Sequence, residues 1–458
     1  MQELTRRTFL KTSAAVTAMA GVLGAGSEEK AAMNGLLVGV AAREVTPDPG
    51  VKMWGYSDRK EASSGVLDPL MARALVFRNT DRTIGWVVLE LGRVPTEPVM
   101  ERIRAEAEKA GIDKVIFSAT HTHGGPIMES DDAPHVLRIE KGIIEALEEA
   151  AGRLTEARVG IGHATLDISH NRRVIKDGEC YMLWRNEKRV PTSPLDHEAT
   201  LIKLDDAQGK PLATLVHFAC HPVVLGADNV QYTSDFAGHM ARLVKAATGA
   251  ECFYVQGGCG DINPYLDKTP LPEGGIESMH AVGKECADGV LAALKAIPTQ
   301  PLAEPVLAYY ESAVEIGTRF DFTRPDIQDV FRRAYGPRFD AMQSVLTPDL
   351  SVPLVTLVIG RDIGLAFMPG ELFVQFQLDL KSKSAVPHTL LCGYANGFHL
   401  YFPTVQGAAA GGYGGLVATY VGAGAGDKLV AQALTDLGRI SGRVKDRITV
   451  EDFNLKEL

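Results

Sequence analysis

Apolar residues recur along this chain with two different periods, and their alternation predicts a layered protein of strands and helices. Runs rich in β-branched and aromatic residues, which are typical of strands, occupy residues 72–78, 84–91, 114–120, 158–168, 199–206, 212–222 and 251–261. Stretches with apolar residues three and four positions apart, which are typical of amphipathic helices, occupy residues 97–111, 137–154, 234–249, 274–297 and 426–437. Residues 352–372 predict a further strand hairpin that turns around Gly360–Gly364. We therefore expect a mixed α/β (α+β) fold, with layered sheets and helices in one large unit.

The N-terminal residues differ from the rest of the chain. Arg6 and Arg7 precede a weakly hydrophobic, alanine-rich stretch, residues 13–26, in the pattern of a twin-arginine export signal. A frayed N-terminal helix is the alternative interpretation. The apolar stretch is shorter than the ~20 residues that a membrane span needs. We therefore expect residues 1–32 to be a signal peptide, residues 33–458 to form the mature domain without a transmembrane segment, and the mature protein to be periplasmic or secreted.

The amino-acid composition limits the classes of molecule that we expect this protein to bind. Asp and Glu exceed Lys and Arg by 57 to 47, which gives a net charge of −10. A nucleic-acid partner is not expected, because phosphate binding needs a basic surface. The 45% hydrophobic and 23% charged content is that of an ordinary globular protein. None of the six cysteines shows the paired spacing of a metal knuckle, and the sequence leaves the oligomeric state open.

Several predicted strands end in polar or glycine-rich turns. The segment FSATHTHGGP (117–126) places His121 and His123 two positions apart, and on an extended strand both side chains would project from the same face. The two imidazoles could share a metal, or one could bind it while the other moves protons. His221 ends a second strand and Glu371 follows a third, and these nitrogen and oxygen ligands suit a catalytic zinc. The alternatives are a polar strand end for the histidine pair, a structural role for His221 and a helix N-terminal carboxylate for Glu371.

A series of short motifs runs through almost all of the mature chain. They are GY (55–56), ARALVF (72–77), THTHGGP (120–126), HNRR (170–173), HFACHP (217–222), TSDFAG (233–238), QGGCGDINP (256–264), MPGE (368–371) and YANGFHLYFPT (394–404). Their order resembles the catalytic domain of the neutral/alkaline ceramidase family. Members of that family are zinc amidohydrolases that split ceramide into sphingosine and a fatty acid.

The resemblance implies a Zn²⁺ cofactor and a defined set of residues around it. Four positions match the metal ligands of the family: His121, His221, Glu371 and Tyr401. Four further positions match its catalytic pocket: His123, Arg172, Asn263 and Tyr413. In this scheme His123 passes a proton to the leaving nitrogen, Arg172 helps to position the substrate, and Tyr413 or Asn263 steadies the oxyanion.

The sequence departs from the family pattern in two ways. Asn263 stands where the family usually has an active-site serine, and an asparagine cannot act as a nucleophile although it can hydrogen-bond a carbonyl. Family members also carry an immunoglobulin-like domain after the catalytic domain, and we expect none here, since the chain ends at Leu458. The expected function is an exported zinc-dependent hydrolase of an amide bond in a small or lipid-like acyl substrate, in which a zinc-activated water attacks the carbonyl. The alternatives are a zinc esterase or lactonase acting on a polar or sugar-derived substrate, and a non-catalytic binding relative.

Overall fold

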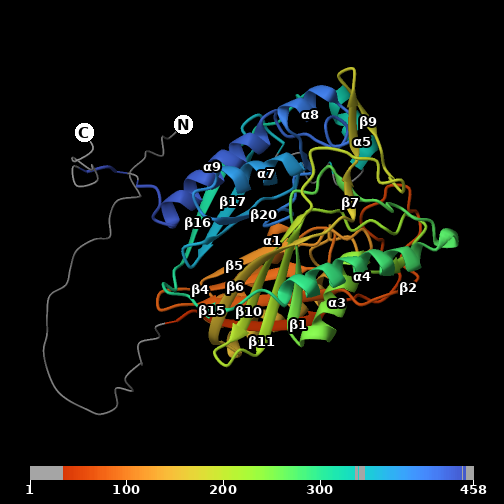
Figure 1. The fold of residues 1–458 in the computed structure, drawn as a ribbon. Helices are drawn as coiled ribbons and strands as arrows, with labels where there is room; N and C mark the ends of the chain where they lie inside the picture. The colour runs from red at the N-terminus through yellow and green to blue at the C-terminus, as the bar shows by residue number, and fades with distance from the viewer. Residues whose placement is uncertain (1–34, 336–338, 340–345, 446, 450–458) are drawn as a thin grey trace, which may run out of the picture. The chain divides into compact units, whose positions relative to one another are not determined.

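The structure is a computed structural model that describes residues 35–335, 339, 346–445 and 447–449, so the signal peptide expected at residues 1–32 lies outside the described residues. Two β-sheets form its centre (Figure 1). The larger sheet has the strand order β13 (Glu251–Gln256), β11 (Pro211–Phe218), β10 (Glu198–Asp206), β6 (Thr155–Thr165), β1 (Leu37–Glu44), β3 (Met71–Arg78), β4 (Thr83–Leu89) and β5 (Lys114–Ala119), with β15 (Gln300–Pro301) paired to β6. The smaller sheet has the order β16 (Leu307–Glu315), β17 (Ser351–Ile359), β18 (Ile363–Phe367) and β20 (His388–Cys392).

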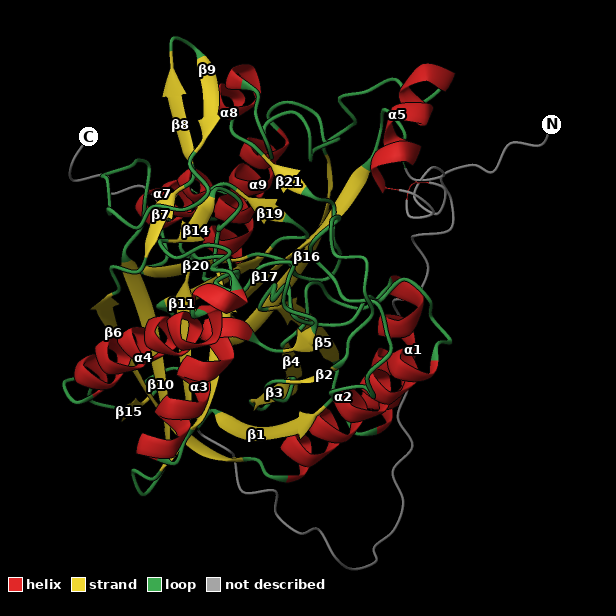
Figure 2. Ribbon diagram, turned by 90° about the vertical axis from the view of Figure 1, so that its right-hand side faces the viewer, coloured by secondary structure: helices red, strands yellow, loops and turns green. Residues whose placement is uncertain are grey.

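Helices cover the outer face of each sheet, and Figure 2 shows these helices, in red, around the central strands. Four helices pack on the larger sheet: α1 (Glu97–Lys109), α2 (Pro134–Gly152), α3 (Asp235–Thr248) and α4 (Gly275–Leu294). Two helices cover the smaller sheet: α7 (Val374–Lys383) and α9 (Ala425–Ile440). The shorter helical segments are η1 (Leu271–Glu273), α5 (Pro325–Tyr335) and α8 (Val405–Ala410).

Alternation of apolar residues along the strands produces this helix–sheet–sheet–helix layering. In β4, Ile84, Trp86 and Val88 belong to the core between the two sheets, whereas Val87 and Leu89 pack against the helices. Successive strand residues point to opposite faces, so a strand buried on both faces is apolar throughout. Each large apolar side chain that is fully buried contributes about 1.5–3 kcal/mol to the free energy of unfolding.

Strand ends from both sheets meet at one place. The N–H of Ala119, at the end of β5, donates to the carbonyl of Tyr394, which lies just beyond β20. The N–H of Gly393 donates to Gln256 at the end of β13, and the N–H of Gly257 donates to Phe218 at the end of β11. The loops that follow β5, β11, β13 and β20 are therefore tied together by backbone hydrogen bonds.

Short strand pairs extend from this junction. They are β2 (Gly65–Val66) with β12 (Gln231–Tyr232), β7 (Ser169–Asn171) with β14 (Ile262–Pro264), β8 (Arg173–Lys176) with β9 (Glu179–Met182), and β19 (Glu371–Leu372) with β21 (Tyr401–Phe402). The predicted mixed α/β fold of layered sheets and helices is confirmed. The hairpin predicted over residues 352–372 is β17 and β18, whereas β1, β16 and α7 were not predicted from the pattern. Among the described residues, no helix has both the length and the apolar character that a bilayer crossing requires.

Candidate metal centre

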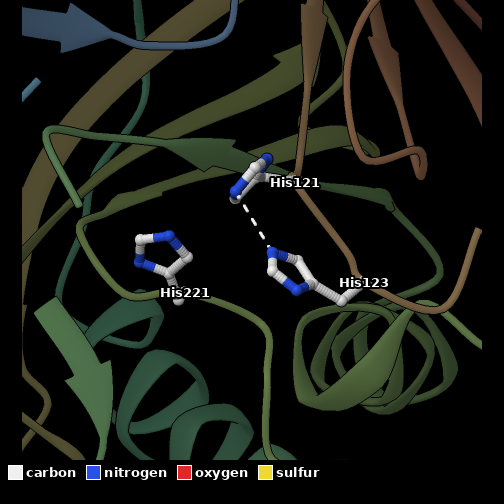
Figure 3. Close-up of side chains that lie close together, drawn as sticks. All are labelled: His121, His123 and His221. Carbon is white, nitrogen blue, oxygen red and sulfur yellow. Dashed lines mark hydrogen bonds between the residues drawn. The ribbon is translucent and has the colours of Figure 1, made fainter. Parts of the chain in front are cut away.

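Three histidine side chains come together where the strand ends meet (Figure 3). The Nε2 atoms of His121 and His123 are 3.3 Å apart, and one ring nitrogen from each of His121, His123 and His221 lies within 4.8 Å of the others. His121 and His221 are each 1% exposed. His121 and His123 follow β5, and His221 follows β11, so two strand ends supply the cluster.

The histidine pair converges for a different reason from the one predicted. β5 ends at Ala119, and His121 has a φ of 67°, in the left-handed region, so the two histidines do not share one face of a strand. A turn brings their rings together instead. It is fixed because the His121 N–H donates to Leu91, and because Gly124 packs where a Cβ would lie 2.4 Å from the carbonyl oxygen of Thr233.

Backbone carbonyls set the orientation of two of the three rings. His121 Nδ1 lies 2.6 Å from the carbonyl oxygen of Gly92, and His221 Nδ1 lies 2.9 Å from that of Ile262. A carbonyl can only accept, so each Nδ1 carries the proton and each Nε2 presents a lone pair. This is the arrangement that orients histidine ligands in metal sites.

A carboxylate meets the two lone pairs. Glu371 Oε2 is 3.1 Å from His221 Nε2 and 3.4 Å from His121 Nε2, and Glu371 is 4% exposed. Burial alone would raise the pKa of Glu371, but a second proton on His121 or His221, carried at Nε2, would hold it well below its usual range. Three acceptors facing one another in a buried space repel unless a cation lies among them. The arrangement of these nitrogen and oxygen atoms therefore fits a metal ion.

Tyr401 reaches the same point through strand pairing. Glu371 and Tyr401 are register partners in the parallel pair of β19 and β21, so their backbones lie side by side. Tyr401 is 4% exposed. Burial raises the pKa of Tyr401 well above its usual value, and the charge of Glu371 adds to this.

A chain of polar contacts continues from Tyr401. Arg172 donates from Nη2 to the Tyr401 hydroxyl (3.0 Å) and from Nη1 to Asn263 Oδ1 (3.1 Å). Asn263 in turn donates from Nδ2 to Asp267, which also pairs with Lys268 at 2.6 Å. The pairing of β7 with β14 brings the Arg172 and Asn263 segments together. Both ends of the Asn263 amide are thus engaged, and its position sets that of the Arg172 guanidinium.

Aromatic side chains form the solvent side of this region. The Arg172 guanidinium lies 5.1 Å from the ring centre of Trp184 and 5.5 Å from that of Tyr413. Trp184 is 37% exposed and Tyr413 is 38% exposed, and their rings contact edge to face. The ring of Tyr413 also contacts that of Tyr401 edge to face, with centres 5.4 Å apart, so it links the solvent side to the buried cluster.

His123 differs from the other two histidines. Within the described part of the chain its Nδ1 is buried without a hydrogen-bond partner. Burial lowers the pKa of His123 well below its usual value, and repulsion from His121 and His221 lowers it further. The ring packs against Tyr56, with ring centres 4.8 Å apart. His123 therefore lacks the carbonyl contact that orients the rings of His121 and His221.

Sequence reasoning missed two buried residues behind the cluster. Tyr394 stacks on His121 with ring centres 4.0 Å apart, and its hydroxyl lies 3.4 Å from Glu371 Oε2. The thiol of Cys259 is 2.9 Å from the same hydroxyl. Burial raises the pKa of Cys259 and of Tyr394 well above their usual values, so both keep their protons. Both residues lie inside motifs that carried the family resemblance, but an apolar strand end gives no reason to single them out.

Comparisons with known proteins identify the family. Residues 36–251 match the family described as neutral/alkaline non-lysosomal ceramidase, N-terminal. This segment belongs to the neutral/alkaline ceramidase N-terminal domain family, which confirms the resemblance. Residues 3–23 match a twin-arginine translocation pathway signal sequence, so twin-arginine export is confirmed as well.

Individual ceramidases are also similar to this chain in sequence and in structure. The neutral ceramidase of Pseudomonas aeruginosa is 24% identical over 51% of this chain and 37% of its own length. Neutral ceramidase 2 of Arabidopsis thaliana is 27% identical over 46% of this chain and 30% of its own length. The matched segment thus spans only about a third of these curated relatives. The crystal structure of the Pseudomonas aeruginosa neutral ceramidase superimposes with a TM-score of 0.72 at 18% identity, covering 92% of this chain and 77% of that one, which shows a shared fold.

Proposed function

We propose that this protein is an exported zinc-dependent hydrolase that cleaves the amide bond of a small or lipid-like acyl substrate, with residues 33–458 as its catalytic domain. One observation carries the proposal. Glu371 Oε2 lies 3.1 Å from His221 Nε2 and 3.4 Å from His121 Nε2, and backbone carbonyls fix both histidine rings. Membership of residues 36–251 in a ceramidase family supports the amide bond as the target.

The proposed ligands are the four residues of the buried cluster, His121, His221, Glu371 and Tyr401. A zinc ion held there supplies a Lewis acid and lowers the pKa of water toward ~7. All four side chains are nearly inaccessible to solvent, which strengthens electrostatic interactions inside the cluster.

The remaining residues handle protons and charge. His123 is the proton carrier, because its Nε2 lies 3.3 Å from that of His121 while no backbone carbonyl holds its ring. The guanidinium of Arg172 faces the substrate carbonyl and is held in place by Asn263. Tyr413 donates its hydroxyl to the developing oxyanion. In this arrangement Asn263 takes no part in bond making, consistent with its place in the contact chain between Arg172 and Asp267.

The test is a hydrolysis screen of the full chain against ceramide, N-acyl amino acids and small esters, with and without a chelator. We expect amide hydrolysis that the chelator abolishes and that added zinc restores. His121→Ala should be inactive, whereas His280→Ala, which removes an exposed histidine on α4, should match the unchanged protein. Turnover of esters alone would assign an esterase instead. Binding of the acyl compounds without turnover would assign a non-catalytic relative.

A further inference from the structure

Lys268 brings a positive charge to the solvent side of the metal centre. It lies in the loop after β14, and its N–H donates at 2.9 Å to the carbonyl of Val223, two residues beyond the proposed ligand His221. Its Nζ lies 4.4 Å from the ring centre of Trp184, and the Arg172 guanidinium lies 5.1 Å from the same ring centre. Two cations therefore share one aromatic ring next to the metal centre.

The acid that pairs with Lys268 is covered by protein. Asp267 Oδ2 accepts from Lys268 Nζ at 2.6 Å and from Asn263 Nδ2 at 2.8 Å. The Asp267 side chain is 0% exposed, whereas that of Lys268 is 38% exposed. An ammonium carries three donors, and among the described residues Asp267 is its one hydrogen-bond partner. The charge of Asp58 also acts on Lys268, but Asp58 is exposed, so solvent screens it. A molecule that approaches from solvent thus meets the lysine side chain and not its buried acid.

Arg172 adds a second positive charge without adding a negative one. Its guanidinium donates to Asn263 Oδ1, to the carbonyl of Gly260 and to the Tyr401 hydroxyl. Burial raises the pKa of Tyr401 well above its usual value, so all three acceptors are uncharged. The positive charges of Arg172 and Lys268 thus exceed the negative charge held behind them, which favours an anion at this place.

Aromatic rings flank the exposed lysine. Trp184 follows β9 and Tyr413 follows α8, and these two elements lie side by side (Figures 1 and 2). The two rings contact each other edge to face, and each residue is more than a third exposed. The Tyr413 ring also contacts that of the proposed ligand Tyr401, with centres 5.4 Å apart. This wall therefore suits an anionic group that is carried on a short organic chain and reaches toward the metal centre.

The charge of the wall decides which half of an acyl amide it receives. An acyl chain is apolar and gains nothing from an ammonium, so the cation suits the amine half. We propose that the substrate is an N-acyl amino acid whose carboxylate accepts from Lys268 Nζ. This inference rests on the proposed amide hydrolysis, which adds water across the amide and releases a fatty acid and the free amino acid.

The test compares the N-octanoyl derivatives of glycine, β-alanine and γ-aminobutyrate with the corresponding carboxamides, which lack the negative charge. Release of octanoate by the zinc-loaded full chain is measured for each compound. We expect kcat/KM to be roughly ten- to a hundredfold higher for the best carboxylate than for its carboxamide. The three spacers show how far from the amide the carboxylate must lie to reach the lysine.

Two variants of Lys268 and one control assign the effect. Lys268→Gln should lower kcat/KM for the carboxylates by roughly tenfold, chiefly through KM, and leave the carboxamides unchanged. Lys268→Arg keeps the charge and should retain the preference. Lys381→Gln is the control, because Lys381 Nζ also pairs with a buried acid, Asp196 at 2.9 Å, and Asp196 keeps a second amide partner, Gln377. It should leave both classes of compound unaffected.

The outcomes separate this inference from the proposed function. Hydrolysis of carboxamides as fast as carboxylates, or an equal fall for both classes in Lys268→Gln, would overturn the inference while the hydrolase stands. If no amide is cleaved, the proposed function fails, and binding of the same carboxylates is measured by calorimetric titration. Binding that Lys268→Gln weakens by roughly tenfold would support the anion site, and binding that it leaves unchanged would refute it.

Discussion

Tyr394→Phe should weaken metal binding although Tyr394 is not a proposed ligand. The substitution keeps the ring that stacks on His121 at 4.0 Å and removes only the hydroxyl. That hydroxyl lies between the Cys259 thiol, at 2.9 Å, and Glu371 Oε2, at 3.4 Å. Since both Cys259 and Tyr394 stay protonated, the hydroxyl can accept from the thiol and donate to the carboxylate.

The magnitude follows from the kind of bond that is lost. A hydrogen bond to a charged group is worth about 1.5–3 kcal/mol, and about 1.4 kcal/mol corresponds to tenfold in affinity. Loss of a partner that orients a ligand typically costs about 10–100-fold in metal affinity. We therefore expect Tyr394→Phe to bind zinc about 10–100-fold more weakly than the unchanged protein.

The assay is competition for zinc with a chromogenic chelator, and Tyr254→Phe is the matched control. Tyr254 is also a buried tyrosine, but its hydroxyl donates to the backbone carbonyl of Cys220 at 3.0 Å. Each variant removes one buried hydroxyl, so their unfolding free energies should agree to within about 1 kcal/mol. Only Tyr394→Phe should lose metal affinity. Equal zinc affinities in the two variants would refute the orienting role of Tyr394.

Three further predictions concern ligand roles, pH and export. His121→Ala should lose zinc and activity together, whereas His123→Ala should keep most of its zinc and lose about 10²–10⁴-fold in rate. Measuring the metal content and the turnover of both variants tests this assignment. The reverse pattern would mean that the two roles are exchanged. Burial lowers the pKa of His217 from 6.5 to about 4, so between these pH values the unfolded state binds more protons than the folded state. The free energy of unfolding should therefore fall by on the order of 3 kcal/mol as the pH drops through this window. Denaturant unfolding at several pH values should show a shallower fall for His217→Gln, and an unchanged slope would contradict the shift. Changing Arg6 and Arg7 to lysine should leave the precursor in the cytoplasm; normal export of this variant, followed by cell fractionation, would exclude the twin-arginine route.

The local pattern of apolar and polar residues was sufficient to predict the layers of strands and helices in this protein. The apolar run over residues 84–91 predicts a strand buried on both faces, and β4 is such a strand, with Trp86 toward the second sheet and Val87 toward the helices. The twin-arginine signal could also be predicted from the sequence alone, because an export signal is recognised as a linear sequence. Elements of weaker pattern, such as β16 with its half-exposed face, gave no comparable signal.

The site depended partly on resemblance and partly on tertiary structure. Motif order pointed to His121, His221 and Glu371, and the structure brings Glu371 Oε2 to 3.1 Å from His221 Nε2 and 3.4 Å from His121 Nε2. The assignment of the eight site residues to ligand and pocket roles remains a prediction. The strand-face argument for His121 and His123 was wrong, since a left-handed turn after β5 brings their rings together.

Only the tertiary structure decided which distant residues meet. Glu371 and Tyr401 are thirty positions apart in the sequence, and they become neighbours because β19 pairs in parallel with β21 in one register. Tyr394 reaches Glu371 because the loop beyond β20 is bound to the end of β5. Periodicity reports which face of an element is buried, but the partner and register of a strand follow from the packing of the whole chain. The sequence therefore determined the layers and the candidate ligands, and the packing of those layers determined the geometry in which the ligands meet.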